Sequence, residues 1–103
     1  MRQIKVHGVT HNNIPADGGR SRQEVISEIH NSGREDIIAE LDYVNCKGGR
    51  VGVRIKDQKT NQVLGWLPKY LEEEFANAEE RILTCKAQIA YHGVWHVSLM
   101  IEE

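Results

Sequence analysis

The chain has 103 residues, of which 40% are hydrophobic and 27% charged, and its formal net charge is -2 at pH 7. This size and mixture predict one globular domain over 1–103 that needs neither metal nor crosslink, and the net charge excludes nucleic-acid binding through bulk positive charge. The N-terminal residues show no signal-peptide pattern and no run of 18 apolar residues occurs, so we expect a cytoplasmic protein without a membrane span.

Three elements are predicted in the first part of the chain. Apolar alternation predicts a strand over residues 2–12, interrupted at Gly8 by a bulge or a close backbone approach. A capping box at residues 21–24 begins a helix over about 22–31, which a glycine then ends. Residues 36–45 alternate again and predict a strand with one apolar face.

The most clearly amphipathic strand covers residues 50–56. Successive side chains of a strand point to opposite faces, so its outer face is expected to be wholly cationic; the residues on that face are Arg50, Arg54 and Lys56. Residues 43–69 contain six Lys or Arg against Asp57 alone, a local balance of +5 (six minus one). Such segregation is typical of a surface that binds a polyanion. The alternative is that cationic residues are simply common on solvent-exposed strands.

A short strand over 63–67, a helix from Pro68 to Arg81 and a closing hairpin over 82–103 complete the prediction. Three glutamates lie near the N-terminal end of that helix, where the helix dipole favours negative charge. The positions expected to be buried here are Leu71, Phe75 and Ala78 on the helix, then Leu83, Cys85, Ala87, Ile89, Trp95, Val97, Leu99 and Ile101 on the hairpin. The fold class is therefore α+β and mainly β: a small, modified barrel of the SH3 or OB kind, with about six strands and two helices.

Metal and catalytic chemistry have little support in the sequence. The histidine pairs 7/11 and 92/96 lie on expected strands, where side chains four residues apart are separated by about 13 Å. Cys46 and Cys85 lack CxxC spacing and are expected to remain thiols, and no local pattern ties a histidine to Cys46. We expect no metal, no cofactor, no catalytic residue and no small-molecule substrate.

Four stretches together resemble the HIRAN domain over about residues 4–100: VHGVTHNN, the helix RSRQEVISEI, the strand RVGVRIKDQ and the turn VLGWLPKYL. Members of this family form small modified barrels, occur in DNA-repair remodellers and as standalone bacterial proteins, and include binders of single-stranded DNA and its free 3′ end. The resemblance implies a bacterial-type standalone member with the same kind of ligand.

The resemblance also implies particular site residues. Lys69 and the preceding Trp66 match a turn that contacts the DNA backbone, and Thr10 and His11 fall where end-binding members have a basic residue and a stacking tyrosine. Residues 45–49 lack the tyrosine and the aspartate that the family supplies for the terminal hydroxyl, so recognition of a free end stays open.

The leading hypothesis is a non-enzymatic module that binds single-stranded DNA weakly, through cations for the phosphates and an aromatic ring for the bases. The predicted contact residues are Thr10, His11, Lys47, Arg50, Arg54, Lys56, Trp66 and Lys69. Three alternatives remain: Trp66 belongs to the core, the chain is a protein-interaction or self-association module without nucleic-acid binding, or it is a small hydrolase or metal enzyme.

Overall fold

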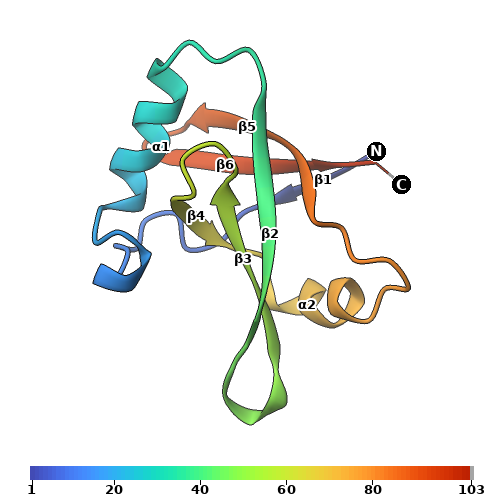
Figure 1. Cartoon of the computed structure of the whole chain (residues 1–103). Helices are drawn as coiled ribbons and strands as arrows, with labels where there is room; N and C mark the ends of the chain where they lie inside the picture. Colours follow the sequence, from blue (N-terminus) through green and yellow to red (C-terminus); the bar gives the residue numbers. More distant parts are fainter. Residues whose placement is uncertain (103) are drawn as a thin grey trace.

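The structure is a computed structural model that describes residues 1–102, apart from the side chain of Asp17. Within these residues it has six strands and two helices: β1 (Arg2–Lys5), α1 (Arg22–Asn31), β2 (Ile37–Asn45), β3 (Val51–Asp57), β4 (Val63–Trp66), α2 (Lys69–Ala76), β5 (Thr84–Tyr91) and β6 (Trp95–Ile101). All strand pairs are antiparallel, and the sheet curls into a half-barrel (Figure 1). The predicted fold class and element order are confirmed.

The two outer strands of the sheet meet each other. The order β1-β6-β5-β2-β3-β4 leaves β1 and β4 as edges, but the chain just after β1 pairs with the end of β4. His7 N donates to Trp66 O at 2.8 Å, and Trp66 N donates to His7 O at 2.9 Å. Gly65 permits this approach, since a Cβ there would lie 2.6 Å from Val6 Cγ1. The closure places the N-terminal segment beside Trp66.

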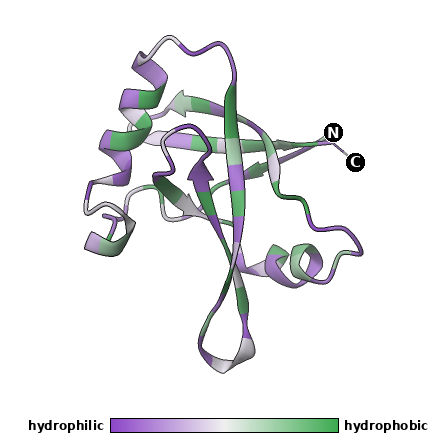
Figure 2. Cartoon of the chain, viewed as in Figure 1, coloured by the Kyte–Doolittle hydropathy of each residue, from purple (hydrophilic) through white to green (hydrophobic). Residues whose placement is uncertain are grey.

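Helix α1 covers one end of the half-barrel and contacts β4 and β6 (Figure 1). Its apolar stripe, visible in Figure 2, packs into the core through Val25, Ile26 and Ile29. The capping box is half formed: Ser21 Oγ accepts from Glu24 N at 3.4 Å, but the Glu24 carboxylate pairs with Arg20 at 3.1 Å. The helix boundaries agree with the prediction.

The first strand is shorter than predicted, because it ends at Lys5 and not near residue 12. Residues 8–11 form a turn in which His11 N donates to Gly8 O at 3.0 Å. Gly8 adopts a φ of +75°, which glycine tolerates and which ends the extended chain. The predicted irregularity at Gly8 is therefore a turn.

Helix α2 is also shorter than predicted, because Pro68 is its N-cap and the helix ends at Ala76. Arg81 Nε donates to Ala76 O at 3.0 Å and satisfies a carbonyl at the helix end. Two residues expected in the core are instead exposed: Ala78, which lies beyond the helix, and Leu83, which is 62% exposed. In the described part of the chain no helix has the length and apolar content required to cross a membrane.

Candidate nucleic-acid interface

A surface groove of about 620 Å³ gathers residues from four separated segments of the chain. We call it the Trp66 groove, and it is lined by His7, Gly8, His11, Arg22, Arg50, Trp66, Leu67, Lys69 and Tyr70. Four of the eight predicted contact residues are in this set: His11, Arg50, Trp66 and Lys69. None of the described residues that line the groove is Asp or Glu. The groove therefore combines cationic and aromatic side chains without a carboxylate.

Trp66 lies on the outer face of the sheet and is half-buried. A Cβ at Gly52 would lie 2.9 Å from Trp66 Cζ3 and 3.1 Å from Cys46 Sγ, so the indole rests against the bare backbone of β3. The preceding residues Val63 and Leu64 are both buried. The alternative that this strand belongs to the core therefore holds for Val63 and Leu64. It does not hold for Trp66, whose side chain is partly accessible.

The segment that carries the two groove histidines is held by the first residues of α1. Arg22 Nη1 donates to Gly8 O at 2.9 Å, and Arg22 Nε donates to Asn13 Oδ1 at 2.7 Å. Gln23 Nε2 donates to Val9 O at 2.9 Å. Arg22 is buried, so its guanidinium supports the groove from beneath and its hydrogen bonds fix the turn.

Lys69 and Tyr70 enter the groove from the first turn of α2. Lys69 is exposed and forms no ion pair with any other described residue. Tyr70 is 78% exposed and was missed by the sequence analysis, as was His7. Two signals pointed to them: Tyr70 lies off the apolar stripe of its helix, and His7 directly follows an inward-facing valine.

Arg50 lines the groove but is already paired. Its Nη1 lies 2.9 Å from both carboxylate oxygens of Glu72, whose side chain is only 7% exposed. The Glu72 carboxylate, predicted to interact with the helix dipole, therefore also anchors Arg50. This contact positions the guanidinium at the groove and cancels much of its net charge.

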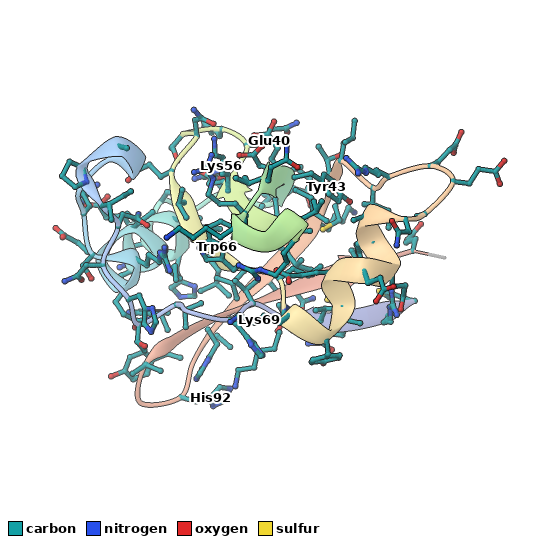
Figure 3. The ribbon with its side chains drawn as sticks, turned by 90° about the horizontal axis from the view of Figure 1, so that it is seen from below. Glu40, Tyr43, Lys56, Trp66, Lys69 and His92 are labelled. Atoms are coloured by element: carbon teal, nitrogen blue, oxygen red, sulfur yellow. The ribbon has the colours of Figure 1, made fainter. Side chains whose placement is uncertain are left out.

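Arg54 and Lys56 lie on the outer face of β3 as predicted, but this face is not an open cationic surface, because a carboxylate of β2 pairs with both. Arg54 Nη2 lies 2.7 Å from Asp42 Oδ2, and Lys56 Nζ lies 3.7 Å from the same atom. The cause is the strand register, which sets Asp42 opposite Arg54 and Glu40 opposite Lys56; Figure 3 shows Glu40 next to Lys56. Both cations are outside the Trp66 groove and are neutralised by β2.

Two further predicted contacts also lie outside the groove lining. Lys47 is exposed in the short 3-10 turn Lys47–Gly49, at the tip of the β2–β3 hairpin (Figure 1). Thr10 is exposed in the turn at residues 8–11, next to His11. The structure thus places four predicted residues in the groove lining and four outside it, although Thr10 adjoins His11 and Arg54 lies opposite Trp66 across the β3–β4 pair.

The histidine spacing argument was wrong for one pair. The ring centroids of His92 and His96 are 6.0 Å apart, because His92 lies in the hairpin turn and not on a straight strand. Even so, no three His, Cys, Asp or Glu side chains of the described residues are grouped to hold a metal ion. Cys46 Sγ donates to Val44 O at 3.6 Å, a backbone contact.

Comparison of the chain with protein-family models, with curated proteins and with solved structures found no match. The HIRAN resemblance therefore stays a prediction. The functional argument depends on the geometry and the charges of the Trp66 groove.

Proposed function

We propose that this chain is a non-enzymatic, HIRAN-like module that binds single-stranded nucleic acid, with DNA as the expected ligand, in the Trp66 groove. One observation carries the proposal: four segments far apart in the sequence contribute cations and aromatic rings to a groove whose described lining has no carboxylate. Polyanion binding requires such a surface, and single-strand binders combine it with rings on which bases stack.

Two kinds of side chain in the groove have different proposed roles: cations contact phosphates, and aromatic rings stack on bases. Lys69, which pairs with no carboxylate among the described residues, supplies an ammonium for a phosphate, and Arg50 supplies a guanidinium that Glu72 holds in place. Trp66 and Tyr70 supply the stacking surfaces, at about 1–3 kcal/mol for each stacked base. Because few cations are free of carboxylates, we expect modest affinity with a shallow salt dependence, about 0.7 in slope for each phosphate contacted.

Recognition of a free DNA end is not part of this proposal, since residues 45–49 lack the tyrosine and the aspartate of the end-binding members. Tyr70 supplies an aromatic ring from a different element, and a ring that stacks on bases does not require an end. A cytoplasmic location is also proposed, because the two cysteines are unpaired thiols, as they would be in a reducing compartment.

Fluorescence anisotropy with a labelled oligothymidylate at about 50 and 200 mM salt tests the proposal. Tyr70→Ala removes a ring that packs little against the fold, and we expect at least about fivefold weaker binding from the lost stacking. Lys69→Gln should weaken binding and lower the salt slope by about 0.7. Lys56→Gln is the matched control: it removes the same charge, but from a lysine near Asp42, and should leave affinity nearly unchanged.

Two results would oppose the proposal. Equal effects of Lys69→Gln and Lys56→Gln would show that binding follows total charge and not the groove. Absence of binding at low salt, together with a defined dimer in light scattering, would favour the protein-interaction alternative.

A further inference from the structure

The outer face of β1 and β6 carries basic side chains that no sequence argument singled out as a group. Lys5 on β1 and His96 on β6 point outward, because the residues on both sides of Lys5 and the residue after His96 are buried. The strands are paired so that Lys5 lies opposite Ser98, two residues from His96. Lys5 and His96 are therefore neighbours on one surface.

This surface has no acidic side chain on its two strands. The outward positions of β1 and β6, together with the residue at position 7, are Gln3, Lys5, His7, His96, Ser98 and Met100. Lys5 forms no ion pair with any described residue. The contrast with β3 is direct, since the cations of β3 face Glu40 and Asp42 across the strand pair.

The positive charge of this surface comes mainly from Lys5, because His96 binds its proton less readily than an ordinary histidine. Burial, followed by the charges of Lys5 and His92, holds the pKa of His96 below its ordinary value of 6.5. The rings of His92 and His96 are 6.0 Å apart, so the hairpin turn adds a second imidazole to this surface. A phosphate placed here would be attracted by the charge of Lys5, while the neutral form of His96 offers a hydrogen bond and no charge.

The surface continues directly from the Trp66 groove. His7 lines the groove and pairs with Trp66, and it lies two residues, about 7 Å along a strand, from Lys5. Val6 N donates to Val97 O at 2.9 Å, so β6 accompanies the chain between these positions. In the view of Figure 3, Lys69 lies between Trp66 and His92.

We propose that a single strand bound in the Trp66 groove continues over the outer face of β1 and β6, with its phosphates beside Lys5, His92 and His96. This inference rests on the proposed function and gives the bound strand a path. Contacts here are to the phosphodiester backbone and not to bases, so this part of the site is independent of sequence. It lengthens the bound segment beyond what the groove alone holds.

Oligothymidylates of two lengths separate the groove from the extension: a tetranucleotide and a dodecanucleotide, titrated by anisotropy at low salt. Lys5→Gln should weaken binding of the dodecanucleotide severalfold, lower its salt slope by about 0.7 and leave the tetranucleotide unchanged. Lys59→Gln is the matched control. Lys59 is also exposed, but it lies in the loop between β3 and β4, outside the lining of the Trp66 groove and on neither β1 nor β6, so both affinities should stay as in the wild type.

The outcomes distinguish this inference from the function on which it rests. If Lys5→Gln binds the dodecanucleotide as tightly as the wild type does, or if Lys59→Gln loses as much affinity, the extension is overturned while the groove stands. If the wild-type chain binds neither oligonucleotide, the proposed function fails, and the extension fails with it.

Discussion

Replacing Arg34 by methionine tests whether a buried ion pair holds the β3–β4 hairpin that carries Trp66. Arg34 Nη1 and Nη2 donate to the two carboxylate oxygens of Asp57 at 2.9 and 2.8 Å, and Thr60 Oγ1 donates to the same carboxylate at 2.7 Å. Asp57 ends β3 and is 0% exposed. Burial by itself raises the pKa of Asp57, but the hydrogen bonds from Arg34 and Thr60 outweigh it and hold that pKa below its usual value.

The expected loss of unfolding free energy follows from the hydrogen bonds that Asp57 keeps in the variant. Methionine keeps an apolar stem but removes both guanidinium donors, so Asp57 retains only its bonds to Thr60. Removing one partner of a buried ion pair costs about 3–5 kcal/mol, and because the Arg34 side chain is 14% exposed we expect about 3 kcal/mol. A chain of 103 residues has an unfolding entropy of about 0.22 kcal/mol per kelvin, so the Tm should fall by about 14 °C.

Thermal unfolding followed by circular dichroism at pH 7 measures this loss. Arg20→Met is the matched control, because Arg20 makes a similar two-pronged contact with Glu28, but on the surface, where water screens the pair. The pH dependence gives a second check: an Asp57 pKa below 3.8 stabilises the fold above that pH, and this stability is lost as the pH falls through the lowered value. Equal Tm losses in the two variants, or a gap between Arg34→Met and wild type that does not narrow in acid, would refute the reasoning.

Three further predictions concern the closure of the sheet, a histidine and a thiol. Gly65→Ala should open the closure, because its Cβ would collide with the carbonyl oxygen of His7; amide exchange at His7 should accelerate, and unchanged protection would contradict the closure. Acidification below pH 6.5 should destabilise the wild type more than the His96→Gln variant. Burial and two basic neighbours lower the pKa of His96, so the unfolded chain takes up the proton at a higher pH than the folded chain does. Equal losses of unfolding free energy in urea titrations of the two proteins would oppose this. Burial raises the pKa of Cys85 to about 11, so in a Cys46→Ser background its alkylation, followed by mass spectrometry, should be slow at about pH 8 and accelerate with alkali; rapid reaction at the lower pH would contradict it.

Local patterns predicted the order of the elements well but missed where some of them end. The alternation that continues to Leu83 predicts a buried side chain, yet Leu83 precedes β5 and is exposed, since no element covers it there. Helix α2 stops at Ala76, where the Arg81 side chain returns to its last carbonyl, a contact between residues five apart that periodicity does not encode. Boundaries thus depend on tertiary contacts that the pattern does not contain.

The charge argument failed for a related reason. The excess of +5 was counted over residues 43–69, and the carboxylates that neutralise it, Asp42 and Glu72, lie just outside that range. Their pairing follows from strand register and from the way α2 packs on β3, neither of which is visible in a count along the chain. Lys69, which follows Pro68 at the start of α2, is exposed and lines the Trp66 groove, but its predicted contact with nucleic acid stays a prediction.

The distribution of carboxylates also bears on how a polyanion would approach. The chain has a net charge of -2, so long-range attraction cannot bring a polyanion to it efficiently. Asp42 and Glu72 reduce the field further, but Glu72 also holds Arg50 in place at the groove, which lowers the entropy lost when a ligand binds. If the proposed function holds, binding in the Trp66 groove depends on short-range contacts with Lys69, Trp66 and Tyr70. A ligand held in this way would dissociate quickly and exchange readily.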